Sequence, residues 1–179
     1  TLHNQGCLVV LTGTREDAVH KVAGKLGSRC KVVPTDLSDH SNAAKLLEQL
    51  GEDIAGLDIL VNNAGITRDN LSLRMKDEEW TEVISLNLTT TFKLCQAALK
   101  FMVKQRWGRI INITSVVAFT GNAGQAYFSS SISCLTFLPL SLSSDPSLRL
   151  LTLSPFSPFI LSTPITQFLH YHLTDLLLY

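Results

Sequence analysis

Short apolar runs alternate with stretches of helical periodicity along the first two thirds of the chain. Residues 7–11 (CLVVL) form an uninterrupted apolar run, which predicts a buried strand. From Glu16 to Leu26 apolar residues recur at helical spacing, and Gly27 follows as a stop signal. The same criteria predict strands at 31–33, 59–61 and 109–113, and helices at 41–50 and from 77 to about 105. Strands that alternate with helices of this length predict an α/β fold, a doubly wound parallel sheet with helices on both faces.

Polar turns follow these strands, at the edge of the sheet where such folds bind ligands. The third run stops at Asn62-Asn63-Ala64-Gly65, where two small residues allow a close approach to a flat or anionic ligand. Thr12-Gly13-Thr14 is similar to the start of a glycine-rich phosphate loop. However, Asp17, Ala18 and Val19 stand where further glycines are needed, so we reject that match.

Several polar residues have an ordinary structural interpretation. Asp77 is expected to cap the long helix, and Asp36 to cap a helix or a turn. Asn87 lies inside the long helix, where asparagine is a mediocre helix former, so spacing alone favours a satisfied polar residue at a kink. Ser115 reads as a turn residue after the fourth strand. Arg106 belongs to a basic helix end beside the negative pole of the helix dipole.

Composition narrows the function classes. The chain has 179 residues, 15 basic and 15 acidic side chains and a net charge of zero, so neither nucleic acid nor an acidic surface is indicated as a partner. The cysteines at 7, 30, 95 and 134 form no CxxC pair, which predicts small buried apolar residues in a reducing compartment rather than disulfides or a zinc site. No signal peptide pattern opens the chain, and we expect a cytoplasmic protein or one of an organelle matrix.

The composition changes near Phe128. Residues 129–179 contain no glycine or lysine, and their only charges are Asp145, Arg149 and Asp175. We therefore predict two parts: 1–128, a partial dinucleotide-binding domain, and 129–179, a Leu/Ser/Pro-rich tail. The uncharged run 150–174 is long enough to span a bilayer, but its prolines argue against a transmembrane helix. We interpret the tail as a shifted reading frame, a read-through or a mis-joined gene end, with a membrane-held tail as the alternative.

The segment 58–80, DILVNNAGITRDNLSLRMKDEEW, resembles the short-chain dehydrogenases/reductases. Its NNAG turn is typical of that family, and the residues after it resemble the branch of 3-oxoacyl-[acyl-carrier-protein] reductases. The resemblance extends to about residue 126. It implies a Rossmann-type fold and NADPH-dependent reduction of a carrier-bound 3-oxoacyl chain to its (3R)-hydroxyacyl form.

The resemblance also implies a cofactor site. Thr14 and Arg15 fall where the family holds the adenosine ribose, and an arginine there favours the 2′-phosphate of NADP(H) over NAD(H). Asp36 and Leu37 fall at the turn that contacts the adenine. Asn63, Ala64 and Gly65 correspond to the cofactor wall.

For catalysis, the resemblance implies that Asn87 is a proton-relay residue and that Ser115 bonds the substrate carbonyl. The family's proton-donating tyrosine and the lysine four residues later correspond to Phe128 and Ile132. Tyr127 stands one position early, and no lysine follows Lys104. Loss of the general acid alone predicts a rate of catalysis at least ~10³-fold lower.

The resemblance implies that the run at 7–11 is the second strand of the family's sheet. The family's first strand, with its glycine-rich loop, would precede Thr1 and lie between the second and fourth strands, so we expect an incomplete sheet in which two strand pairs face each other across a gap. Its sixth and seventh strands are expected to be missing as well. Buried backbone amides would be left unpaired along that gap.

The resemblance further implies partners. Arg106 falls where the family contacts the acyl carrier protein, and the long helix corresponds to part of a homotetramer interface. Two alternatives remain open. One is a non-catalytic interaction protein that pairs with intact subunits, and the other is a short-chain reductase for acetoacetyl thioesters, sugars or steroids.

Overall fold

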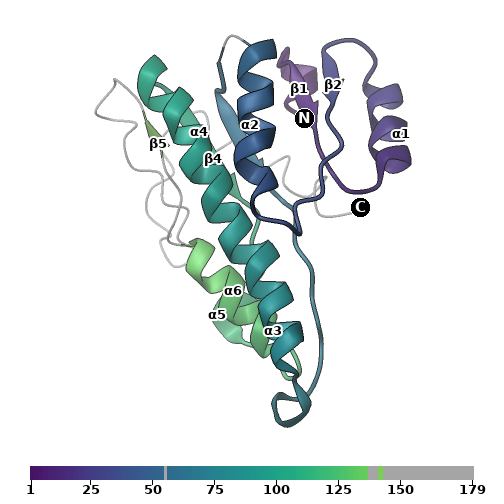
Figure 1. Cartoon of the computed structure of the whole chain (residues 1–179), viewed down its shortest axis with the longest axis vertical. Coiled ribbons are helices and arrows are strands. Elements are labelled where there is room, and N and C mark those ends of the chain that lie inside the picture. The colour runs from purple at the N-terminus through teal and green to yellow at the C-terminus, as the bar shows by residue number, and fades with distance from the viewer. Residues whose placement is uncertain (55, 137–140, 143–179) are drawn as a thin grey trace.

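The computed structural model describes residues 1–54, 56–136 and 141–142. The predicted alternation of strands and helices is confirmed (Figure 1). The helix predicted from Glu16 to Leu26 has those bounds, and the predicted strands are shifted by one or two residues. The main elements are β1 (Val9–Leu11), α1 (Glu16–Leu26), β2 (Cys30–Val32), α2 (Asn42–Asp53), β3 (Ile59–Asn62), α3 (Asp77–Ile84), α4 (Thr91–Gln105), β4 (Gly108–Asn112), α5 (Val117–Thr120), α6 (Ala126–Thr136) and β5 (Ser141–Leu142).

The described strands form two separate sheets, as the expected gap predicts. β1 pairs in parallel with β2, with Val9 opposite Cys30, and β3 pairs in parallel with β4, with Ile59 opposite Arg109. The two-residue β5 adds to β4 in the antiparallel direction. In the view of Figure 1, α2 stands between β1 and β2 on one side and β4 on the other. The fold is a doubly wound α/β fold whose parallel strands do not form one continuous sheet in the described part of the chain.

The core lies where α2 and α4 pack side by side, with α4 packed against β3 and β4 (Figure 1). Gly108 at the start of β4 allows the closest approach, because a methyl group there would overlap the side chain of buried Met102 on α4. By contrast, α1 contains no buried residue. The central core residues are Leu46, Leu47 and Leu50 from α2, Leu94, Ala98 and Met102 from α4, and Ile110 from β4.

The long helix keeps its predicted bounds but is interrupted by a π-helical stretch, Ser85–Thr90, between α3 and α4. The hydroxyl of Thr90 donates to the carbonyl of Ser85, five residues earlier, and to the carbonyl of Leu37, both at 3.0 Å. The wide turn therefore has a tertiary cause, since Thr90 also contacts the loop after β2. Asn87 lies within this stretch.

Two local predictions are wrong. Asp77 does not cap α3: the helix begins at Asp77 itself, one residue earlier than a cap at Asp77 requires, and the Glu79 carboxylate reaches back to accept the N–H of Lys76 at 3.1 Å. The cysteines are not uniformly buried. Cys95 is buried, Cys7 and Cys30 are half-buried, and Cys134 is exposed on α6. All four are free thiols.

In the described part of the chain, no helix combines the length and apolar character that a membrane crossing requires. The run 150–174, which we considered for such a role, lies outside the described residues.

Candidate functional site

A cavity of about 350 Å³ lies where the carboxyl ends of β3 and β4 meet α6 and the π-helical stretch. Ligand sites in doubly wound sheets occupy this position, and the volume falls within the usual range for small-molecule pockets. It is lined by Asn62, Asn63, Ala64, Gly65, Ile66, Thr67, Asn87, Thr91, Ile113, Thr114, Phe128, Ile132 and Leu135.

Asn87 holds the loop after β3 against the π-helical stretch. Its Oδ1 accepts the N–H of Ile66 at 2.9 Å, and its Nδ2 donates to the Ile66 carbonyl at 2.9 Å. Nδ2 also donates to the Ser131 hydroxyl of α6 at 3.1 Å. With 2% of its surface exposed, Asn87 is a satisfied polar residue at a helix irregularity, as spacing alone suggested. Asn87 also lines the cavity, and its role as a proton-relay residue stays a prediction.

Gly65 lies directly against the amide that fixes the loop. A Cβ at this position would lie 3.4 Å from Oδ1 of Asn87, at the edge of ordinary van der Waals contact. Asn63, Ala64 and Gly65 are all exposed on the cavity side of this loop. The loop therefore presents a small, polar surface to the cavity.

Helix α6 presents apolar side chains to the cavity. Phe128 and Ile132, one helical turn apart, both line it. Between them, the buried Ser131 hydroxyl accepts from Asn87 and donates to the Phe128 carbonyl at 2.8 Å. No ionisable side chain is among the described residues that line the cavity.

Tyr127 does not line the cavity. Its hydroxyl donates to the Lys76 carbonyl at 3.0 Å, and its ring meets Trp80 edge-on, with centroids 5.3 Å apart. Burial, followed by the nearby Glu79 and Asp77 carboxylates, raises the pKa of the Tyr127 phenol above its ordinary value. The Tyr127 phenol therefore points from α6 toward the start of α3, and burial favours its neutral form.

Ser115 also lies outside the cavity lining, whereas its neighbour Thr114 is part of it. The Ser115 carbonyl accepts the N–H of Ala118 at 3.0 Å, at the turn that begins α5. The structure thus brings Asn87, Asn63, Ala64 and Gly65 together and leaves Ser115 and Tyr127 beside them.

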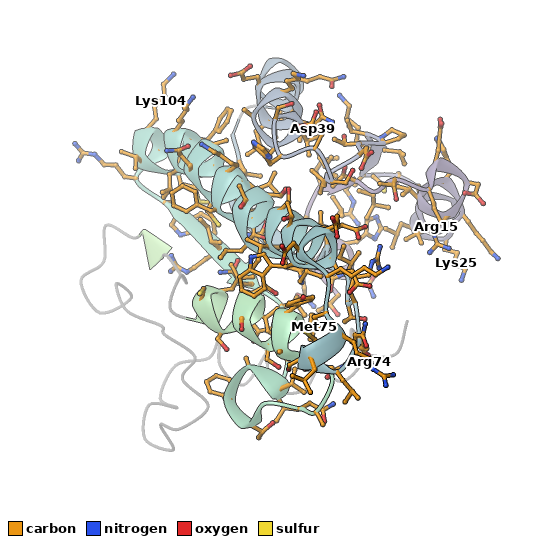
Figure 2. All side chains as sticks on the ribbon, turned by 60° about the horizontal axis from the view of Figure 1, so that its bottom comes forward. Arg15, Lys25, Asp39, Arg74, Met75 and Lys104 are labelled. Atoms are coloured by element: carbon orange, nitrogen blue, oxygen red, sulfur yellow. The ribbon has the colours of Figure 1, made fainter. Side chains whose placement is uncertain are left out.

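The residues predicted for the adenosine half of a nucleotide follow the strands of the other sheet. Thr14 and Arg15 are exposed after β1, and Figure 2 shows Arg15 on the α1 side of the molecule, with Lys25 nearby in the view. The Asp36 carboxylate accepts from the hydroxyl and the N–H of Ser38 at 2.7 and 2.9 Å, and these hydrogen bonds lower its pKa. Leu37 is buried beside it. Asp36 thus forms the turn that its structural interpretation predicted.

Arg106 lies at the opposite end of the sheet from the cavity, between α4 and the amino end of β4. It is exposed and adopts the left-handed conformation, with φ 57°. The N–H groups of Arg106 and Trp107 close the last turn of α4 on carbonyls of Val103 and Met102. A helix C-terminus of this kind usually carries glycine.

Sequence reasoning missed Asn62 as a site residue. Its Nδ2 donates to Oδ1 of Asn112 at 2.9 Å and contacts Sγ of Cys95 at 3.3 Å, while its own Oδ1 has no hydrogen-bond partner in the described structure. Only 7% of Asn62 is exposed. Both asparagines follow apolar runs in the sequence, but their pairing depends on the register of β3 against β4.

Residues 1–172 match the short chain dehydrogenase family. The chain belongs to that family. It is 40% identical over 168 residues to the 3-oxoacyl-[acyl-carrier-protein] reductase FabG of Haemophilus influenzae, an alignment that covers 94% of this chain and 69% of the relative. The corresponding protein of Aquifex aeolicus is 41% identical over 172 residues, with coverage of 94% and 69%. Nodulation protein G of a Rhizobium species is 40% identical over 166 residues, with coverage of 93% and 68%.

Short-chain dehydrogenases are generally oxidoreductases that use NAD(P)H. The matched range runs past Phe128, and the domain boundary at that residue stays a prediction.

Proposed function

We propose that this short-chain dehydrogenase derives from the NADP(H)-dependent 3-oxoacyl-[acyl-carrier-protein] reductases, and that as written it binds the nucleotide but has lost efficient reduction. The 3-oxoacyl-[acyl-carrier-protein] reductases to which the chain is about 40% identical support assignment to this branch of the family. One observation carries the loss of activity: Phe128 and Ile132 line the cavity, and the neighbouring phenol of Tyr127 is bonded to the carbonyl of Lys76, just before α3.

Reduction of a ketone to an alcohol requires a hydride at carbon and a proton at oxygen. Bound NADPH supplies the hydride, so the protein has to supply the proton. Phe128 has no acidic proton, and Ile132 provides no positive charge to lower the pKa of a donor. Asn87 uses its amide on Ile66 and Ser131, and the Ser131 hydroxyl donates to a backbone carbonyl. We therefore expect turnover at least ~10³-fold below that of an intact reductase.

The residues expected to contact the nucleotide suit dinucleotide binding, whereas the cavity-lining residues of α6 do not suit catalysis. Ala64 and Gly65 leave the loop after β3 without bulk, at the carboxyl end of a parallel strand. Arg15 is exposed at the carboxyl end of β1, where a guanidinium can form paired hydrogen bonds with a 2′-phosphate. These features support a preference for NADP(H) over NAD(H).

The test is a fluorescence titration of the full chain with NADPH and NADH, together with NADPH oxidation in the presence of acetoacetyl coenzyme A. We expect NADPH to bind at least tenfold more tightly than NADH. Arg15→Ala should remove that preference, and Lys25→Ala, which removes another exposed basic residue of the α1 region (Figure 2), should keep it. Turnover within tenfold of the Haemophilus influenzae relative would contradict the proposed loss of catalysis, and equal affinities for the two nucleotides would contradict the assigned role of Arg15.

A second candidate function is pairing with intact subunits of a related reductase. Phe92 and Val103 of α4 are 47% and 61% exposed, and a spacing of eleven residues puts them on one face of the helix. Exposed apolar residues in such a row are typical of interaction surfaces. Co-expression with a full-length 3-oxoacyl-[acyl-carrier-protein] reductase should give a mixed oligomer on size exclusion. Phe92→Asp should prevent its formation, whereas elution of the two chains apart would exclude this function.

A further inference from the structure

We propose that the unpaired edges of β1 and β3 together bind one extended apolar segment of another polypeptide, which inserts between them as a strand. The segment pairs with both edges at once and thereby joins the two sheets. Val10 and Val61, the central residues of this surface, do not line the cavity, so the surface is distinct from the site described above.

The first argument is the direction of the main-chain groups of β1. In a parallel pair of strands, the N–H and C=O of every second residue point to the neighbouring strand, and those of the residues between point away from it. The N–H of Val9 donates to the carbonyl of Arg29 at 2.9 Å. The carbonyl of Leu11 accepts the N–H of Val33, also at 2.9 Å, so both residues of β1 face β2. The N–H and C=O of Val10 therefore point to the opposite side, where no described strand pairs with β1.

The same analysis of β3 gives a second unpaired edge. The carbonyl of Asp58 accepts the N–H of Arg109 at 2.9 Å. The carbonyl of Asn62 accepts the N–H of Ile113, also at 2.9 Å, so the even-numbered residues of β3 face β4. The N–H and C=O of Val61 therefore point away from β4, to a side on which β3 has no strand partner in the described part of the chain.

The two unpaired edges face each other. In the view of Figure 1, β1 lies on the side of β2 that is nearer to α2 and β4, and β5 lies on the outer side of β4. Since β3 and β5 flank β4, β3 lies on the side of β4 toward β1. An extended segment can bond both edges, because its own N–H and C=O groups alternate between its two sides. A helix cannot do so, because it uses these groups internally.

The side chains beside these edges favour an apolar segment. Val10 and Leu60 pack against the core that α2 and α4 form. Val61 points to the other face of its strand and is 37% exposed, and Leu8, just before β1, is 57% exposed. Neither β1 nor β3 contains a charged residue. A segment fits both faces when apolar residues that point to the core alternate with uncharged residues that point to the partly exposed face.

A free segment suits this surface better than a second copy of the chain does. A strand that inserts between two edges needs both of its own edges unpaired. Each described strand already pairs with a neighbour on at least one side. A described strand of a second copy would have to leave its sheet first, whereas a segment that is unfolded before binding supplies both edges. Such strand addition draws its affinity from main-chain hydrogen bonds and its specificity from alternate side chains.

The probe is the acetylated and amidated heptapeptide Lys-Val-Thr-Val-Thr-Val-Lys. Its valines alternate with threonines, as the two faces require, and its terminal lysines keep it soluble. We expect this peptide to bind the full chain in calorimetry. Hydrogen exchange at the amides of Val10 and Val61 should slow at least tenfold when it binds, because both N–H groups then have an acceptor.

Two N-methylated versions of the probe distinguish insertion from addition to an outer edge. One is methylated at the three valines and the other at the two threonines. An inserted strand uses N–H groups on both of its sides, so both versions should bind at least tenfold more weakly than the unmodified peptide. Addition to the outer edge of β2 or β5 uses one set alone. Full affinity of either version would therefore overturn insertion.

Val61→Pro tests the edge from the side of the protein. Proline is tolerated where the N–H of an edge strand faces away from its neighbour, so the variant should fold, which circular dichroism checks. The missing N–H and the added ring should weaken peptide binding at least tenfold. Val22→Ala is the control, because it removes another exposed apolar side chain, on α1, and should leave the affinity unchanged. An unchanged affinity in folded Val61→Pro refutes the proposal, and if this variant does not fold, the N-methylated peptides decide.

Other occupants of the two edges give different results. If a segment of the same chain or a second copy fills them, the amides of Val10 and Val61 exchange slowly before any peptide is added. This protection depends on protein concentration for a second copy and is independent of it for a segment of the same chain. Either result overturns the proposal, as does the absence of peptide binding.

Discussion

Replacing Asn87 by alanine tests whether this side chain fixes the loop after β3. The change removes three hydrogen bonds, two to the backbone of Ile66 and one to the hydroxyl of Ser131. Each contributes about 1 kcal/mol net to the free energy of unfolding. Their loss therefore costs about 3 kcal/mol, of which the higher helix propensity of alanine offsets about 0.5 kcal/mol. We expect the free energy of unfolding to fall by about 2.5 kcal/mol.

Urea denaturation gives the change in stability, and hydrogen exchange gives its location. The Ile66 amide should exchange much faster in Asn87→Ala, because its acceptor is Oδ1 of Asn87. Asn122→Ala is the matched control. Asn122 is exposed, and its side-chain amide donates a hydrogen bond to Gln125. Its loss should therefore change the free energy of unfolding by less than about 0.5 kcal/mol. Equal destabilisation by the two variants, with unchanged exchange at Ile66, would refute the reasoning.

Asn87→Asp separates the acceptor from the donors. The variant keeps an oxygen for the Ile66 N–H but places a carboxylate beside the Ile66 carbonyl in a site that is almost fully buried. Burial should raise the pKa of this carboxyl in the folded state. The variant should then be more stable below the ordinary pKa of aspartic acid and lose stability as the pH rises through the raised value. A pH-independent difference from wild type contradicts this assignment.

Three further predictions concern other parts of the fold. Gly108→Ala should lower the free energy of unfolding by about 1–3 kcal/mol in urea denaturation, because the added methyl overlaps buried Met102; an unchanged midpoint refutes that close contact. Arg106→Gly should raise it by about 0.5–1 kcal/mol, since φ at this residue is 57°, and a loss of stability contradicts the assigned backbone strain. Tyr127 should ionise above pH 10 in the difference titration of wild type and Tyr127→Phe. Its contribution to stability is complete below pH 10 and is lost as the pH rises through the raised pKa, so ionisation at or below pH 10 counts against its burial.

Much of the fold could be predicted because strand and helix periodicity is local. The helix from Glu16 to Leu26 was found with its bounds, and the separation of the two strand pairs followed from the family comparison. The π-helical stretch was missed because it depends on Thr90 reaching the carbonyl of Leu37, which lies 53 positions away in the sequence. The cap at Asp77 was wrong because Glu79 reaches back to the backbone of Lys76.

The site was predictable only as far as its loops. The family resemblance located Asn63, Ala64 and Gly65, and the structure places all three on the cavity. It did not indicate that Tyr127 bonds Lys76, since this contact depends on how α6 is rotated against α3. The unsatisfied oxygen of Asn62 also depends on tertiary structure, because the strand register decides which groups its amide meets.

The separation of the two sheets has a consequence for cooperativity. The unit β1–α1–β2 shares no strand pairing with β3–β4, and α1 has no buried residue. Its link to the core passes through a few side chains, chiefly Val10, Val33 and Leu37. Cooperative units with so few shared contacts open at a lower free energy than the whole domain. We therefore expect amides of β1 and β2 to exchange by subglobal opening while α2, α4 and β4 exchange only on global unfolding. We expect denaturation to show two transitions. A single two-state free energy of unfolding is then an average over two parts of unequal stability.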